Sequence, residues 1–85
     1  MSFVFSNHAL EQMRRRGIKQ EDVEVAMLQP DQKLIDADNP DITIYQSLLN
    51  ESGQVFLLRI FVNTAKAPKV IVTLYRTSKI QKYYQ

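Results

Sequence analysis

The hydrophobic repeat of this chain changes near residue 32, and that change constrains the fold more than any other feature. Before it, apolar residues recur at the three- and four-residue spacing of an α-helix that faces a core. After it, they alternate with polar residues, which is the two-residue repeat of a β-strand. A helical part followed by a stranded part predicts an α+β fold, with two N-terminal helices packed on one face of a three- to four-stranded antiparallel sheet.

Two helices are expected, over residues 7–16 and 20–28. The Ser6 hydroxyl can accept from the free amides of a first turn, and Gly17 can adopt the left-handed conformation that closes a helix. The second segment opens with acidic residues, which suit the positive end of a helix dipole, and it stops at Pro30.

The strands are expected over residues 33–36, 42–49, 54–63 and 69–77. A four-residue loop at 50–53, with Gly53 at its end, joins the second and third of these strands. The third is the most apolar and is expected at the centre of the sheet. Residues 2–5 fit either a staple on the first helix or an additional strand, and residues 78–85 fit either a short helix or a flexible basic arm.

The composition limits the chemistry that the chain can perform. Its 85 residues, 45% of them apolar, predict a single domain over residues 1–85 with one modest core. The absence of cysteine excludes disulfides and thiol nucleophiles, and a single histidine leaves no zinc site, so neither a metal nor a cofactor is expected. No signal peptide or long apolar run is visible, which predicts a cytoplasmic protein without membrane contact.

The net charge is only +2, but the charges are segregated along the chain. Residues 1–19 carry four basic side chains and one acidic side chain, whereas residues 20–51 carry eight acidic and one basic. After residue 51 there are six basic residues and no acidic one. If the first helix lies near the last strand, the basic segments form one patch, for which RNA or an acidic protein is a natural partner.

The polar side of the first helix is one candidate site. It carries His8 in the first turn and Arg15 and Arg16 in the last. A histidine kept neutral by the positive end of the helix, beside amides that attract anions, suits a general base. The ordinary interpretation stays open: arginines in a last turn complement the helix dipole, and a lone surface histidine often has no role.

The sheet face away from the helices is a second candidate site. Its polar set is expected to be Thr43, Tyr45, Ser47, Thr73, Tyr75 and Thr77, joined by Arg59. Hydroxyls and tyrosine rings beside basic residues suit phosphate contacts and base stacking, and Lys79 and Lys82 extend this surface. Arg76 is expected to point the other way, toward the helix that bears His8. Threonine and tyrosine are also simply good strand residues, which is the alternative.

The order of these motifs resembles a bacterial family known as domain of unknown function 4258, over nearly the full length. The residues that carry the resemblance are His8, Ala9, Met13, Arg16, Gly17, Ile18, Glu21, Asp22, Val23, Thr73, Tyr75, Arg76 and Thr77. The family usually has a second arginine just before the methionine, where this chain has Gln12. At the level of fold alone, helices followed by an antiparallel sheet are similar to RelE-type and barnase-like ribonuclease toxins.

The resemblance implies a metal-independent ribonuclease toxin, neutralised by an antitoxin. His8 would act as general acid or base, Arg16 and Arg76 would stabilise charge on the phosphate, and Tyr75 would position the RNA. The remaining nucleic-acid contacts are expected from Arg15, Arg59, Tyr45, Thr73, Thr77, Lys79 and Lys82. Two alternatives remain: a non-catalytic module that binds nucleic acid or an acidic protein, and a homodimer formed through an exposed sheet edge.

Overall fold

The first helix has both predicted caps. In the computed structural model, which describes residues 2–85, α1 (Asn7–Arg16) begins after Ser6, whose hydroxyl oxygen accepts from the Ala9 amide at 3.0 Å. It ends at Gly17, whose φ of 65° is the left-handed conformation. The Ser6 hydroxyl also donates to the Val72 carbonyl at 2.8 Å, which ties the start of the helix to the last strand. The second helix, α2, spans Gln20–Leu28.

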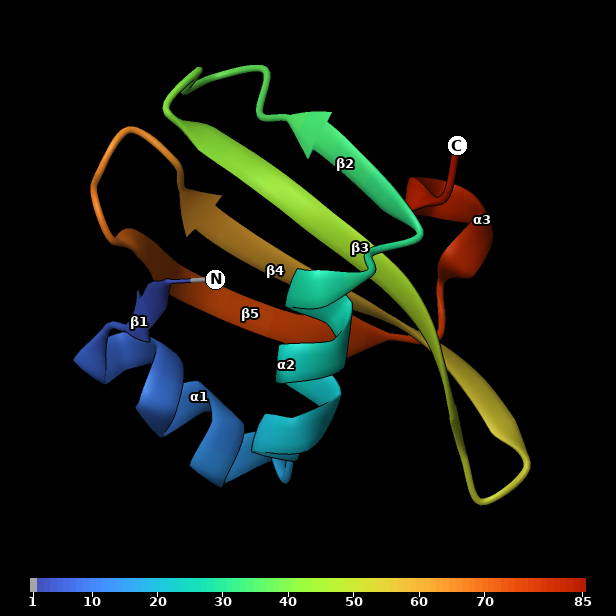
Figure 1. The fold of residues 1–85 in the computed structure, drawn as a ribbon. Coiled ribbons are helices and arrows are strands. Elements are labelled where there is room, and N and C mark those ends of the chain that lie inside the picture. The colour runs from blue at the N-terminus through green and yellow to red at the C-terminus, as the bar shows by residue number, and fades with distance from the viewer. Residues whose placement is uncertain (1) are drawn as a thin grey trace.

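The remaining elements form one sheet and a third helix (Figure 1). The strands are β1 (Phe3–Phe5), β2 (Gln32–Ile35), β3 (Ile42–Glu51), β4 (Gln54–Asn63) and β5 (Lys69–Thr77), in the spatial order β1-β5-β4-β3-β2. The pair β1–β5 is parallel, and the other three pairs are antiparallel. A one-turn helix, α3 (Ile80–Tyr83), follows the last strand. None of the helices within residues 2–85 is long and apolar enough to cross a membrane.

The fold is α+β, but the expected three- to four-stranded antiparallel sheet with only N-terminal helices is wrong. The sheet has five strands because the apolar segment Phe3–Phe5 adds a parallel strand beside Lys69–Ile71. Three residues are too few to show an alternating pattern. The sequence of this segment therefore fits a strand and a staple on the first helix equally well. The third helix lies at the other end of the chain, over Ile80–Tyr83.

The hairpin between β3 and β4 is tighter than the expected four-residue loop. Ser52 and Gly53 have φ values of 52° and 82°, and β3 runs on to Glu51 while β4 begins at Gln54. A two-residue turn with both φ values positive matches the right-handed twist of the flanking strands. The ladder therefore extends to the turn.

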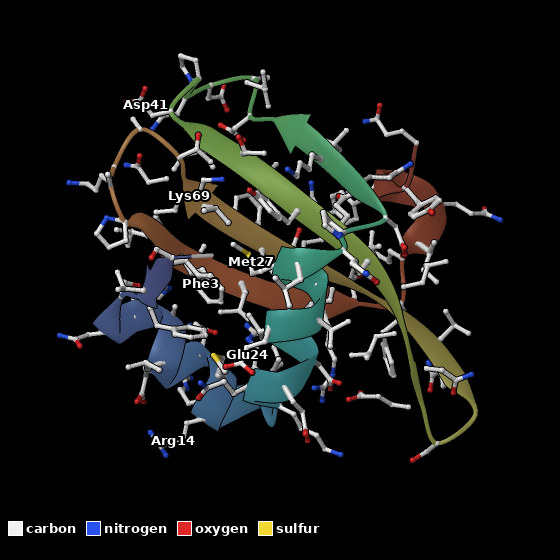
Figure 2. The ribbon with its side chains drawn as sticks, in the orientation of Figure 1. Phe3, Arg14, Glu24, Met27, Asp41 and Lys69 are labelled. Atoms are coloured by element: carbon white, nitrogen blue, oxygen red, sulfur yellow. The ribbon has the colours of Figure 1, made fainter. Side chains whose placement is uncertain are left out.

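α1 and α2 cover one face of the sheet, and the core lies between them and the strands (Figure 1). Its members are Ala9, Met13, Ile18, Val23, Ala26, Met27, Tyr45, Leu58, Ile60, Val62, Ile71 and Leu74. Figure 2 shows Met27 between α2 and the sheet, whereas Arg14 points outward from α1. Each large aliphatic side chain buried here stabilises the fold by about 1.5–3 kcal/mol.

The strand register assigns every residue to one of two faces. Ile60 lies opposite Tyr45 on β3 and Leu74 on β5, and all three belong to the core under the helices. Arg59, one residue earlier, therefore points to the other face, which we call the open face, together with its partners Gln46 and Tyr75.

The expectation that Tyr45 shares a face with Tyr75 is wrong. Tyr45 is 2% exposed and lies beneath the helices, and Thr43 and Ser47 share its phase on β3. Both faces of β3 carry large apolar side chains, so the alternation along that strand did not reveal which set faces the helices. Only its register against β4 determines this.

Candidate nucleic-acid interface

On the polar side of α1, the structure separates His8 from the arginines with which a site was expected. His8, Arg15 and Arg16 are all exposed on this helix. The Arg16 guanidinium is turned back along the helix, where its Nε donates to Gln12 Oε1 at 2.8 Å. His8 and Arg16 are separated by a rise of roughly 12 Å, and within residues 2–85 no hydrogen bond joins His8 to either arginine of the expected site.

Arg76 lies at the far end of α1 from His8. It points to the helix-covered face, where its Nη1 donates to the Gly17 carbonyl at 3.4 Å and its Nε lies 3.4 Å from a Glu51 carboxylate oxygen. The start of α1 is bonded to Val72, several residues earlier on β5, so the helix runs alongside this strand. The helix and the last strand are neighbours, as the patch requires, but His8 and Arg76 mark opposite ends of the contact.

A row of polar side chains crosses the open face instead. Gln32, Gln46, Arg59 and Tyr75 lie directly opposite one another on four neighbouring strands, and we call them the polar row. Hydrogen bonds link them in series. Gln46 Nε2 donates to Gln32 Oε1 at 3.0 Å, Arg59 Nε donates to Gln46 Oε1 at 2.6 Å, and Arg59 Nη1 donates to the Tyr75 hydroxyl at 2.7 Å.

Arg59 is a buried cation surrounded by neutral groups. Only 8% of its surface is exposed, and its guanidinium lies 5.4 Å from the ring centre of Phe61, 5.8 Å from Tyr75 and 4.1 Å from Tyr83. Among residues 2–85 the ion pairs between side chains involve Arg14 and Arg76, so Arg59 pairs with no side-chain carboxylate. Removing a cation from water without an anionic partner is unfavourable, and aromatic faces offset only part of that cost.

The C-terminal segment covers this row. Gln46 Nε2 donates to the Tyr83 carbonyl at 3.2 Å. The Gln32 amide forms two bonds with the backbone of Gln85, donating to its carbonyl at 2.5 Å and accepting from its N–H at 3.1 Å. α3 thus lies on the open face, away from α1 and α2 (Figure 1).

The Tyr83 phenol interacts with neighbouring side chains on this face. Hydrogen bonding to Tyr75 is the largest cause of its lowered pKa, followed by hydrogen bonding to Lys82. The charges of Lys82 and Arg59 are smaller causes that act in the same direction, because they favour the phenolate. The Lys82 ammonium lies 5.3 Å from the ring centre of Tyr83.

The other expected contacts are divided between the two faces. Thr73 and Thr77 lie opposite Phe61 and Leu57 on β4, so they share the open face with Tyr75. Lys79 and Lys82 are exposed beside them. Tyr45 is removed from the interface because it is buried under the helices.

The sequence interpretation missed Gln32, Gln46 and Tyr83. A usable signal was present for Gln46, a long polar residue in the middle of a strand whose neighbours Ile44 and Tyr45 are apolar and buried. Such a residue needs a buried partner, and Arg59 is the partner directly across the ladder. Gln32 and Tyr83 lie at element ends, where no pattern singles them out.

The fold and the site define an α+β domain in which the sheet face opposite α1 and α2 carries a buried arginine. No group of three or more His, Cys, Asp or Glu side chains that could hold a metal ion occurs within residues 2–85. The chain belongs to the family described as Domain of unknown function (DUF4258), whose model matches residues 5–76. The polar row lies inside this match, and α3 lies beyond it. No curated protein and no solved structure matches the chain.

Proposed function

We propose that this protein binds single-stranded RNA through the open face of its sheet. One observation carries the proposal: Arg59 is almost completely buried on that face, is held in place by Gln46 and Tyr75, and has no side-chain carboxylate partner among the described residues. A positioned guanidinium without a counter-ion is suited to an anion that arrives from outside, and phosphate matches its fork of donors.

The groups around Arg59 suit a polynucleotide better than a small anion. Phe61 and Tyr75 are stacked, with ring centres 6.0 Å apart, and both are partly exposed on the same face. Unpaired bases stack on such rings, whereas bases in a duplex do not offer their faces. Lys79 and Lys82, both exposed in the segment that follows β5, would supply further phosphate contacts.

The test is binding of a fluorescently labelled single-stranded oligoribonucleotide by the full chain, measured by anisotropy at two salt concentrations. Arg59→Met, which removes the charge but keeps an apolar stem, is expected to weaken binding at least tenfold. Arg14→Met is the matched control, because Arg14 is exposed on α1 and paired with Glu11, and it should change the affinity less than about twofold.

The wild-type affinity should also fall steeply as salt is added, because phosphate contacts release counter-ions. Equal affinities for wild type and folded Arg59→Met would contradict the proposal. A flat response to salt would also contradict it, since no polyanion would then be held by charge.

A second candidate function, metal-independent cleavage of the bound RNA in the manner of RelE-type toxins, is favoured by the position of the Tyr83 ring, 4.1 Å from the Arg59 guanidinium and 5.3 Å from the Lys82 ammonium. In this alternative Tyr83 stays beside the bound RNA, and its oxygen takes the proton of a ribose 2′-hydroxyl. The 2′-oxygen would then bond to phosphorus as the 5′-oxygen leaves, protonated by water, while Arg59 stabilises the added charge.

Cleavage in the presence of EDTA, with release of 2′,3′-cyclic phosphate ends, tests this second candidate. Tyr83→Phe should abolish cleavage, whereas His8→Ala should leave it unchanged, because His8 lies on α1 at the other face of the sheet. If His8→Ala abolished cleavage and Tyr83→Phe did not, His8 on α1 would be the catalytic residue. RNA that stays intact would leave binding as the function.

A further inference from the structure

Residues 83–85 of the same chain lie on the polar row. The ring of Tyr83 lies over the Arg59 guanidinium at 4.1 Å, the Tyr83 carbonyl accepts from Gln46, and the Gln85 backbone pairs twice with the Gln32 amide. The Tyr83 ring also meets the Tyr75 ring edge-on, with centres 6.4 Å apart, so all four residues in the row are engaged by one short segment. The surface that would contact RNA is occupied in the free protein.

These contacts are of the kind that a nucleobase makes. A planar ring stacks on the face of an arginine, as an unpaired base does. A neighbouring donor and acceptor pair with a glutamine amide, as the edge of a base pairs with glutamine. Residues 83–85 therefore present to the row the same chemical groups, namely a π-face and an adjacent N–H and C=O.

The segment is held more weakly than the rest of the fold. α3 has a single turn of four residues, its N-cap residue Lys79 makes no side-chain cap, and none of its residues is buried. Its bonds to Gln32 are exposed, in contrast to the buried bond between Arg59 and Gln46. Short, exposed elements with few buried contacts open at a small fraction of the global free energy of unfolding.

We propose that Gln32, Gln46 and Arg59 form a nucleobase pocket, which residues 83–85 fill until a base of single-stranded RNA displaces them. The inference rests on the proposed function, and it adds the ligand group and an intrinsic competitor. The base would stack on Arg59 in place of the Tyr83 ring and present its edge to the two glutamines. The measured affinity is then the intrinsic affinity multiplied by the fraction of molecules in which residues 83–85 have left the pocket.

The test compares Tyr83→Ala with Tyr84→Ala, a neighbouring tyrosine that is 36% exposed and makes none of these contacts. The probe is a labelled 2′-O-methyl oligouridine, which binds but cannot be cleaved, and its affinity is measured by anisotropy with the full chain. Removing the competing ring should tighten binding at least about threefold. Tyr84→Ala should leave the affinity within about 1.5-fold of wild type, because Tyr84 does not cover Arg59.

Unchanged or weaker binding by Tyr83→Ala would overturn the inference while leaving the proposed function intact, since Tyr83 would then be part of the binding surface. Absence of binding by wild type and by folded Tyr83→Ala would overturn both. A second measurement distinguishes displacement of residues 83–85 by the RNA from RNA binding beside these residues. The Gln85 amide, bonded to Gln32, should exchange its hydrogen faster when the oligonucleotide is bound, and an equal or slower rate would also overturn the inference.

Discussion

The two faces of the sheet are built from neighbouring residues on the same strands, yet they serve different ends. On the helix-covered face, Ile60 and Leu74 are no more than 1% exposed and meet only other core side chains. On the open face, Arg59 is nearly as buried but is a cation held by neutral groups. One face lowers the free energy of the fold, whereas the other retains a buried charge whose removal from water is unfavourable.

The two faces thus differ in charge rather than in burial. The helix-covered face excludes water and needs no ligand to be complete. The open face is saturated in hydrogen bonds, since no buried side-chain polar atom in the described chain lacks a partner, but it is not neutral in charge. Substitutions on the helix-covered face should therefore change mainly the stability of the fold, and substitutions on the open face should change mainly RNA binding.

The largest effect is expected from a truncation in the core. Ile60→Ala should lower the free energy of unfolding by about 2–5 kcal/mol, because it removes a fully buried side chain and leaves a cavity. The same substitution at Ile35, which is 72% exposed on β2, is the matched control and should cost less than about 0.5 kcal/mol. Urea denaturation followed by circular dichroism measures both, and equal losses would contradict the assignment of the faces.

The second effect is smaller. Arg59→Met, which is expected to weaken binding at least tenfold, should lower the free energy of unfolding by less than about 3 kcal/mol, because removal of a buried charge offsets the loss of its hydrogen bonds to Gln46 and Tyr75. The same urea experiment measures it. A loss of more than about 3 kcal/mol would show that the polar row stabilises the sheet rather than serving a ligand.

A pair of tyrosines sharpens the comparison further. Tyr45→Phe removes a hydroxyl that accepts from Lys69 Nζ at 3.3 Å under the helices, and it should lower stability by about 1 kcal/mol without changing RNA affinity. Tyr75→Phe removes the hydroxyl that accepts from Arg59, and it should weaken RNA binding about threefold or more. Equal effects of the two variants on binding would remove the distinction between the faces.

The smallest effect concerns an exposed pair outside both faces. The Arg14 guanidinium donates to Glu11 at 2.6 Å, which lowers the pKa of that carboxyl below its ordinary value of 4.5. A depressed carboxyl pKa contributes stability above the unfolded pKa, and the contribution disappears as the pH falls through the folded pKa. The small difference in Tm between wild type and Glu11→Gln should therefore be present at pH 7 and absent near pH 2. A difference that persists at pH 2 would contradict the ion pair.

Sequence reasoning could place the local elements because their causes are local. A serine cap and a glycine in left-handed conformation determine where α1 begins and ends, and both are visible in the chain. The register of β3 against β4 is not local, so the face of Tyr45 was assigned wrongly. The same register brings Gln46 beside Arg59. The sequence pattern of each strand alone does not predict that pairing.

The candidate site shows the same limit. The sequence pointed to basic residues on α1 and at the end of β5, and it included Arg59 and Tyr75 on the open face. It could not show that Arg76 is engaged with Glu51 and Gly17, because those contacts join segments far apart in the chain. Contacts between segments that are far apart in the chain therefore determine which arginines are already engaged within the protein.

The most direct test of the account follows the Nε–H signals of the five arginines by NMR while an unlabelled single-stranded oligoribonucleotide is added. The Arg59 signal is expected to shift most, since its guanidinium is the buried cation of the open face. The signals of Arg14 on α1 and of Arg76 beside Glu51 should stay in place. A shift of the α1 arginines with an unmoved Arg59 would contradict it and return the interface to the first helix.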